Sequence, residues 1–370
     1  MPNYTKILHV VGARPNFIKV GPLLKTLRQR LNNNNQLLVH TGQHFDQNMS
    51  NVFFNQLNIQ NPDINLGVSG GTGLEQLTEM LTKLEPPVND FDPECIVVYG
   101  DTNSTLAGAL VGAKLGIPIA HVESGLRSGD HSMPEENNRI LTDHVSSYLF
   151  TPSEDADINL KQENILSDNI FFVGNIMIDT LIASMSKIDN SPILETLELK
   201  SKITGGVLPF NILTLHRPSN VDDHTSLSHL IESIVNIPNN DKVIFPVHPR
   251  SQTKVEILIN KMKTNKIVCI KPLGYIEFLS LLKHAKLVIT DSGGIQEETT
   301  YLGTPCITLR TTTERPVTIN VGTNTLINPT ESNLTDRILE SIQLQRTKQT
   351  AIPKFWDGKT SERIADVLVG

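Results

Sequence analysis

The sequence predicts an α/β protein with two doubly wound parallel-sheet domains and a cleft between them. Short apolar runs alternate with amphipathic, helix-like stretches along the chain, which is typical of parallel strands with helices on both faces of the sheet. The strand candidates are too many for one sheet, and they fall into two similar groups. We therefore expect one domain from residues 1–176 and 354–370, and a second domain from residues 177–353.

The first group of elements starts with a strand at Ile7–Val11, which is followed by a helix from Phe17 to Leu31. Another helix is expected at Ser104–Leu115. Each strand candidate is a short apolar run bounded by residues that favour turns. The remaining strand candidates of this group are Gln36–His40, Cys95–Tyr99, Ile117–Val122, Tyr148–Thr151 and Ile170–Val173.

The second group begins after a boundary expected near Asn175–Leu199. Helical patterns again separate the strands. The tail at Pro353–Leu368, which contains Trp356, is expected to cross back and cover the first domain. The strand candidates of the second group are Asn211–Leu215, Lys242–Val247, Lys266–Ile270, Leu287–Thr290 and Pro305–Leu309.

The net charge, the cysteines and the lack of long apolar runs indicate which partners and which cellular location to expect. The formal net charge of −7 does not favour a nucleic-acid-binding surface. Cys95, Cys269 and Cys306 lie singly in apolar runs, which is typical of reduced core residues and not of disulfides or metal ligands. The sequence shows neither a secretion-signal pattern nor an apolar stretch of about 18 residues. We therefore expect a cytoplasmic protein that binds neither nucleic acid nor a membrane.

The segment from Leu287 to Glu298 is the most informative part of the chain. A strand at Leu287–Thr290 is followed by the turn Ser292–Gly294 and by a helix that begins near Ile295. The free N–H groups at such a helix start, together with the helix dipole, favour a phosphate. One of the two glutamates in the helix could then hold the hydroxyls of a ribose. The alternative is an ordinary turn capped by Ser292, with two surface acids behind it.

Polar and charged residues follow most strand candidates at their carboxyl ends, where parallel sheets bind their ligands. Ordinary turns also contain polar residues, Gly and Pro. The number of Arg, His, Asp and Glu side chains at these ends is harder to explain by turns alone, and it predicts a cleft lined from both halves. The segments are Gly12–Pro15, Thr41–His44, Gly100–Thr102, Glu123–Arg127, His216–Arg217 and His248–Arg250.

With these motifs in this order, the chain resembles the non-hydrolysing UDP-N-acetylglucosamine 2-epimerases, which have two Rossmann-like domains in a glycosyltransferase-B-like (GT-B-like) fold. The resemblance extends from Gly12 to about Gly322. The residues that carry it are Gly12–Pro15 with Lys19, Thr41–His44, Gly100–Thr102, His121–Arg127, Pro134–Glu136 with Asn138–Arg139, Gly174–Asn175, His216–Arg217, Asp291–Glu298 and Thr313–Pro316.

The resemblance implies an isomerase that inverts C2 of the sugar in UDP-N-acetylglucosamine and gives UDP-N-acetylmannosamine. In this family UDP is eliminated to leave 2-acetamidoglucal, and both are then joined again with C2 inverted. The reaction needs a base near C2, a second acid or base on the opposite face, and cations or N–H donors at the departing diphosphate. The resemblance further implies no cofactor, no metal, a homodimer and a role in making cell-surface polysaccharides.

The resemblance also assigns catalytic residues. Asp101, Glu123 and Glu135 match the family's catalytic carboxylates, and His216 matches its essential histidine, which is expected at the diphosphate. Clustered carboxylates raise one another's pKa, as a proton shuttle at neutral pH requires.

Each of these residues also has a structural alternative. Asp101 could cap the following helix, and Glu135 could form an ion pair with Arg139 one turn later. Glu123 could be the buried partner of Arg127 or of another cation. A histidine at a strand end is often a solvated loop residue.

The expected substrate-binding residues are distributed over both halves. Arg14, Lys19 and Arg139 are expected to supply positive charge from the first half. In the second half, the expected contacts are Ser292, Gly293 and Gly294 with the phosphates, Glu298 with the ribose, Arg315 with the diphosphate, and Tyr275 or Phe278 with uracil. The aromatic pair has core packing as its alternative.

The chain also departs from the family pattern. Asn16 stands where many members carry Glu. Gln43, His44 and His248 match a second, activating UDP-sugar site of some members, but residues 66–73 offer no arginine for it, which does not favour activation by substrate. The alternatives for the reaction are the related epimerases of UDP-2,3-diacetamido-uronic acids, a GT-B glycosyltransferase, a hydrolysing relative, and a nucleotide-sugar-binding regulator.

Overall fold

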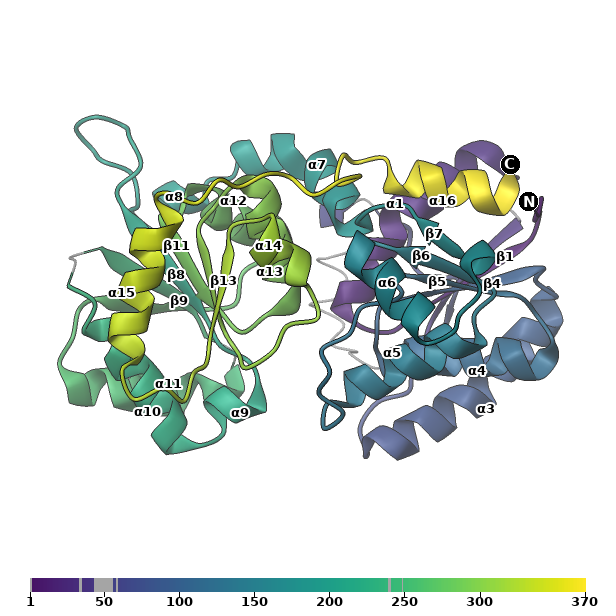
Figure 1. Ribbon diagram of the computed structural model, residues 1–370, viewed down its shortest axis with the longest axis horizontal. Coiled ribbons are helices and arrows are strands. Elements are labelled where there is room, and N and C mark those ends of the chain that lie inside the picture. The colour runs from purple at the N-terminus through teal and green to yellow at the C-terminus, as the bar shows by residue number, and fades with distance from the viewer. Residues whose placement is uncertain (1, 33–34, 43–55, 58, 239–240, 248) are drawn as a thin grey trace. The chain divides into compact units, whose positions relative to one another are not determined.

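The computed structural model describes residues 2–32, 35–42, 56–57, 59–238, 241–247 and 249–370. It divides into two compact units, which we call unit 1 (Met1–Ser184 with Lys354–Gly370) and unit 2 (Met185–Pro353). Each unit contains a parallel sheet with helices packed against it, so the predicted α/β fold class with two doubly wound domains is confirmed (Figure 1).

The sheet of unit 1 has seven strands in the order β3-β2-β1-β4-β5-β6-β7. From β1 the chain adds strands first on one side of the sheet and then, from β4 onward, on the other side. The place between β1 and β4 is therefore the switch point, where open parallel sheets bind their ligands. The strands are β1 (Ile7–Val11), β2 (Gln36–His40), β3 (Ile64–Asn65), β4 (Cys95–Tyr99), β5 (Ile119–Val122), β6 (Tyr148–Thr151) and β7 (Ile170–Phe172).

Alternate side chains of these strands point to opposite faces, as the pleat requires. Ile7 and Val11 join a core with α1 and α16, whereas Leu8 and Val10 join a core with α3 and α4. Both faces are therefore covered. The helices of unit 1 are α1 (Arg14–Arg30), α3 (Gly73–Phe91), α4 (Asn103–Leu115), α5 (Pro134–Val145), α6 (Glu154–Gln162) and α16 (Thr360–Val369), with the 3-10 turn η2 (Ser167–Asn169) and most of α7 (Ile176–Asp189).

The sheet of unit 2 has six strands in the order β10-β9-β8-β11-β12-β13, with its switch point between β8 and β11. The strands are β8 (Phe210–Thr214), β9 (Lys242–Pro246), β10 (Ile267–Ile270), β11 (Leu287–Thr290), β12 (Cys306–Leu309) and β13 (Asn324–Ile327). The helices are α8 (Ile193–Thr196), α9 (Pro218–Val221), α10 (His224–Val235), α11 (Pro249–Met262), α12 (Tyr275–His284), α13 (Gly293–Leu302), α14 (Pro316–Asn320) and α15 (Leu334–Gln345).

The structure differs from the predicted elements at one helix start that matters for the site. The first helix was predicted to begin at Phe17, but α1 begins at Arg14. The fixed φ of Pro15 suits the first turn of a helix, so the proline starts the helix where the prediction had placed a loop. Arg14 therefore lies on a helix start directly after β1.

The C-terminal segment is anchored on unit 1. Trp356 is 1% exposed, and its indole N–H donates to the Pro152 carbonyl at 2.9 Å. Asp179 accepts from the N–H groups of Thr360 and Ser361 at the start of α16, which packs on α1. Among the described residues, no helix is long and apolar enough to cross a membrane.

Replacing Trp356 with Ala is expected to lower the free energy of unfolding of unit 1 by about 3–5 kcal/mol, because it leaves a large cavity and an unpaired carbonyl. Urea unfolding followed by circular dichroism measures the change. Leu166→Ala is the control, since that side chain belongs to the same unit and is 70% exposed, and its loss is expected to cost about 0.5 kcal/mol or less. A loss below about 1 kcal/mol for Trp356→Ala would contradict this anchoring role.

Candidate active site

Two predicted carboxylates follow neighbouring parallel strands of unit 1. Tyr99 at the end of β4 lies opposite Val122 at the end of β5, with Asp101 two residues after Tyr99 and Glu123 directly after Val122. Both carboxylates therefore emerge at the carboxyl edge of the sheet. The side chain of Asp101 is 24% exposed, and that of Glu123 is 5% exposed.

Glu123 forms a buried ion pair with Lys19 of α1, at 2.6 Å between Oε2 and Nζ. Its backbone has a φ of 71°, a left-handed conformation that costs a residue other than glycine roughly 1–2 kcal/mol. Such strain occurs where a side chain must point in one particular direction. The structural alternative of a buried cation as the partner of Glu123 is thus correct, and that cation is Lys19. Arg127 pairs with Asp143 and Glu163 instead.

Asp101 is bound by Arg139 of α5. The Nε and Nη2 atoms of Arg139 lie 3.1 and 3.0 Å from Asp101 Oδ2. The alternative that Asp101 caps the following helix is wrong, because Thr102 is the N-cap of α4 and its side chain accepts from the N–H of Thr105. The Asp101 carboxylate is consequently held at the sheet edge by a cation.

Glu135 lies exposed in the first turn of α5. The next residue, Glu136, is buried and forms the ion pair with Arg139 that the sequence had suggested for Glu135. Glu136 also accepts from the backbone N–H groups of Ser128 and Gly129, which ties the preceding loop to the helix. This loop fixes the helix start on which Glu135 stands.

The side chain of Asn16 makes hydrogen bonds that account for asparagine at this position. Its Oδ1 accepts from the N–H groups of Gly12 and Ala13 at 3.1 and 3.0 Å, and its Nδ2 donates to the Tyr99 carbonyl at 2.7 Å. Asn16, where many family members carry Glu, therefore joins the turn after β1 to the end of β4. Arg14, half-buried on the same helix start, and the buried Lys19 extend from this fixed turn.

In unit 2, a buried carboxylate organises the ends of β8 and β11. Asp291, which is 0% exposed, accepts from the backbone N–H groups of His216 and Arg217 and from Asn220 Nδ2. His216 Nδ1 lies 2.7 Å from Asp291 Oδ1, although the His216 side chain is 55% exposed. Burial alone would raise the pKa of Asp291, but the hydrogen bonds and charge of these partners hold it below its ordinary value. His216 is thus an oriented residue at the surface and not a loose loop side chain.

The predicted phosphate turn opens helix α13. Ser292 occupies the N-cap position but makes no side-chain cap hydrogen bond, which removes the ordinary-cap alternative. A Cβ added at Gly293 would lie 2.7 Å from Arg315 Nη1 and from Glu314 Oε1. A side chain at this position would therefore have to displace the ends of the Arg315 and Glu314 side chains. Gly293 and Gly294 form the first turn of the helix, where N–H groups have no partner within the helix.

The two glutamates behind this turn are buried, so the alternative that they are surface acids is wrong. Glu297 Oε2 lies 3.0 Å from Arg315 Nε. Burial raises the pKa of Glu298 to about 8, opposed by the neighbouring Tyr275 hydroxyl. Tyr275 is buried beside Glu298, whereas Phe278 on the same helix is half-buried.

The raised pKa of Glu298 has a measurable consequence. Folding favours the protonated acid, so its contribution to stability is full below the unfolded-state pKa of about 4.3 and is lost as pH rises through about 8. The wild-type free energy of unfolding is expected to fall by roughly 1–3 kcal/mol relative to that of Glu298→Gln between pH 6 and pH 8.5. Hydrogen exchange of α13 peptides measures it, and equal behaviour of both proteins at the two pH values would refute it.

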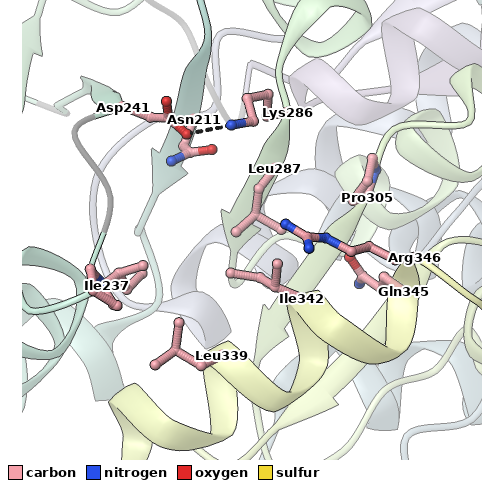
Figure 2. A pocket seen from close by; sticks show the side chains of 11 residues that line it. Asn211, Ile237, Asp241, Lys286, Leu287, Pro305, Leu339, Ile342, Gln345 and Arg346 are labelled. Atoms are coloured by element: carbon pink, nitrogen blue, oxygen red, sulfur yellow. Dashed lines mark hydrogen bonds and ion pairs between the residues drawn. The ribbon is translucent and has the colours of Figure 1, made fainter.

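A cavity of unit 2 lies away from these residues. It has a volume of about 310 Å³ and is lined at the amino ends of β8, β11 and β12, with Leu339 and Ile342 of α15 on its other side (Figure 2). The ion pair between Lys286 and Asp241, at 2.7 Å, closes one edge. His216 and Ser292 follow the opposite, carboxyl ends of the strands, so this cavity is separate from the candidate site.

Three residues predicted for a second UDP-sugar site, Gln43, His44 and His248, lie outside the described residues. Their assignment stays a prediction. Among the residues that the structure describes, no group of three or more His, Cys, Asp or Glu side chains is placed to hold a metal ion.

Each of the two doubly wound sheets has oriented acids and cations beyond the carboxyl ends of its central strands. This arrangement defines an α/β protein of the class that binds ligands at strand ends. The family model described as UDP-N-acetylglucosamine 2-epimerase matches residues 27–369. The chain belongs to this family.

Relatives of the chain are named as 2-epimerases of UDP-linked sugars. A UDP-N-acetylglucosamine 2-epimerase of Methanocaldococcus jannaschii is 42% identical, covering 98% of both chains. A UDP-2,3-diacetamido-2,3-dideoxy-D-glucuronate 2-epimerase of Pseudomonas aeruginosa is 41% identical, covering 98% of this chain and 99% of the relative. The crystal structure of the M. jannaschii UDP-GlcNAc 2-epimerase in complex with UDP-GlcNAc and UDP is similar with a TM-score of 0.86 and 40% identity, covering 98% of this chain and 99% of that one.

Proposed function

We propose that the chain is a non-hydrolysing epimerase that inverts C2 of the sugar in UDP-N-acetylglucosamine and gives UDP-N-acetylmannosamine. The observation that carries the proposal is the pair of strand-end carboxylates, Asp101 and Glu123, each bound to a cation in a chain of this family. Acid and base groups near one sugar carbon are what a proton removal and a proton return require.

In the proposed reaction, unit 1 acts on the sugar. One carboxylate of the set Asp101, Glu123 and Glu135 takes the C2 proton, the electron pair of that C–H bond forms the C1–C2 double bond, and the C1–O bond breaks with its electrons on UDP. The products are 2-acetamidoglucal and UDP. A second carboxylic acid then protonates C2 on the opposite face while UDP adds back at C1. Lys19, Arg139 and Arg14 stabilise the carboxylates and the negative charge that develops.

Unit 2 holds UDP in this proposal. The N–H groups at Gly293 and Gly294, with Ser292, bind the phosphates at the start of α13. His216, oriented by Asp291, and Arg315 act on the diphosphate. Glu298, largely protonated at neutral pH, can both donate to and accept from the ribose hydroxyls. Phe278 is proposed to stack on uracil.

The main alternative substrate is a UDP-2,3-diacetamido-uronic acid, because the relative from P. aeruginosa carries that activity in its name. The test is the initial rate of epimerisation of each nucleotide sugar by the same protein, followed by proton NMR. A higher kcat/KM for UDP-N-acetylglucosamine supports the proposal, and a higher value for the uronic acid replaces the substrate. Turnover only with an added sugar acceptor would indicate a glycosyltransferase instead.

The remaining expectations are part of the same proposal. They are a homodimer, a cytoplasmic location and a role in polysaccharide synthesis. They also include separate roles for two domains: residues 1–176 with 354–370 act on the sugar, and residues 177–353 bind UDP. Light scattering after gel filtration measures the oligomeric state. Initial rates with UDP-N-acetylmannosamine, with and without added UDP-N-acetylglucosamine, test whether Gln43, His44 and His248 serve a second, activating site.

A further inference from the structure

Two histidines are fully buried in the sheet of unit 1, and their surroundings differ. His9 on β1 has its Nδ1 at 2.7 Å from the Tyr99 hydroxyl, and burial lowers the pKa of His9 to about 3. His121 on β5 lies between two acceptors: its Nδ1 is 2.6 Å from Asp143 Oδ1, and its Nε2 is 2.7 Å from the Gly100 carbonyl.

The partners of His121 determine where its protons are. A carbonyl has no proton to give, so Nε2 must carry the hydrogen that binds Gly100. Nδ1 then either donates to an Asp143 carboxylate or accepts from a protonated Asp143. The carboxylate form is the one that the other partners favour, because Asp143 Oδ2 accepts from the Gly125 N–H at 3.1 Å and lies 2.7 Å from Arg127 Nη1. Burial would raise the pKa of Asp143, yet His121 and Arg127 hold it below its ordinary value.

This pair is joined to both strand-end carboxylates through the backbone. Gly100 directly precedes Asp101, and its N–H donates to the Val122 carbonyl at 2.9 Å while its carbonyl accepts from His121. Gly125 lies two residues after Glu123 and is bound by Asp143. Glu123 has a positive φ of 71°, which is costly for a residue other than glycine, so its turn needs such fixing contacts. Gly100 and Gly125, at 66° and 77°, allow the chain to turn on either side without this cost.

We propose that His121 is a positioning residue, hydrogen-bonded to Asp143 and to the Gly100 carbonyl, which fixes the Gly100 and Gly125 turns and thereby aims the Asp101 and Glu123 carboxylates at the substrate. The inference rests on the proposed epimerase function. The charged groups around the ring are Asp143, Arg127 behind it, and the Lys19–Glu123 pair beside Gly100, where a Cβ would lie 2.8 Å from Lys19 Nζ. His121 itself does not touch the substrate in this account.

Ring-nitrogen NMR of the full chain, labelled with 15N in its histidines, tests these hydrogen bonds. His121 is expected to carry a proton on Nε2, because the Gly100 carbonyl can only accept. An unprotonated Nε2 on His121 in the wild-type protein would overturn the inference.

The positioning role is tested with His121→Asn and the matched control His9→Asn, which also removes a fully buried histidine from the same sheet. In His121→Asn, kcat for epimerisation is expected to fall by about 10²-fold, while KM and the affinity for UDP change by about twofold or less. The amide NMR signals of Asp101 and Gly125 are expected to shift. His9→Asn is expected to leave kcat and these two signals unchanged.

Equal losses of kcat in both variants, or unmoved Asp101 and Gly125 signals in His121→Asn, would overturn the positioning role. The ring and amide signals do not depend on turnover. A wild-type protein without epimerisation therefore defeats the proposed function, while these signals still decide separately whether His121 holds the two turns.

Discussion

Glu123→Gln is expected to lower the rate of epimerisation by about 10²-fold or more while leaving UDP binding largely intact. The amide cannot take or give the proton at C2. It also leaves the Lys19 ammonium buried without its charge partner, which is expected to cost about 3–5 kcal/mol of stability. Initial rates by proton NMR, UDP affinity by calorimetry and urea unfolding followed by Trp356 fluorescence measure the three effects.

The double variant Lys19→Met with Glu123→Gln separates the chemical role from the structural one. Removing both charges is expected to recover most of the lost stability, since a buried pair replaced as a whole is often close to neutral. Turnover is expected to stay low. If Glu123→Gln turned over at the wild-type rate, Glu123 would have no part in the proton transfer.

Asp291→Asn is expected to reduce the stability of unit 2 by about 3–5 kcal/mol and to weaken UDP binding, because an NH2 group would replace an oxygen that accepts from N–H donors. His216 would also lose the charge that orients it. Hydrogen exchange of peptides from β8 and β11 measures the stability, and calorimetry measures UDP affinity.

The pH dependence of the Asp291 effect has a definite sign. Because the pKa of Asp291 is lowered in the folded protein, its stabilising contribution is present above the unfolded-state pKa of about 3.9 and is lost as pH falls through the lower, folded value. The difference between wild type and Asp291→Asn should therefore be full at pH 6 and shrink below pH 4. The control is Asp189→Asn, a half-exposed ion pair with Lys283 in the same unit, expected to cost about 1 kcal/mol or less. A comparable cost for both variants would contradict the account.

Apolar periodicity was sufficient to predict the strands at the centre of both sheets. The predicted strands Ile7–Val11, Gln36–His40 and Cys95–Tyr99 coincide with β1, β2 and β4. Two edge strands were missed: β3 has only two residues, and β13 begins with Asn and Thr, so neither forms an apolar run. The alternation of strands and helices predicted that both sheets are parallel and covered on both faces, but it did not give the order of the strands in either sheet.

The partners of the predicted site residues could not be read from the sequence. Spacing suggested Glu135 for Arg139, but the helix turns Glu136 toward it and β4 brings Asp101 to the same guanidinium. Adjacent acids are usually exposed, so the burial of Glu297 and Glu298 required the packing of α12 against α13.

Asp291 and Asp143 had no assigned role in the sequence, because their partners come from strands and turns that are distant along the chain. A strand-end carboxylate followed by a glycine-rich turn was the one local signal for Asp291. The roles of Asp101, Glu123, Glu135 and His216 in catalysis stay predictions.

Incubation of the purified protein with UDP-N-acetylglucosamine in D2O, without added cofactor and followed by proton NMR, tests the central claim most directly. The account predicts a new anomeric signal of UDP-N-acetylmannosamine, with deuterium entering C2 of both nucleotide sugars as the proton is exchanged. An unchanged substrate in the presence of protein that binds UDP, or a product formed with its C2 proton retained, would contradict it.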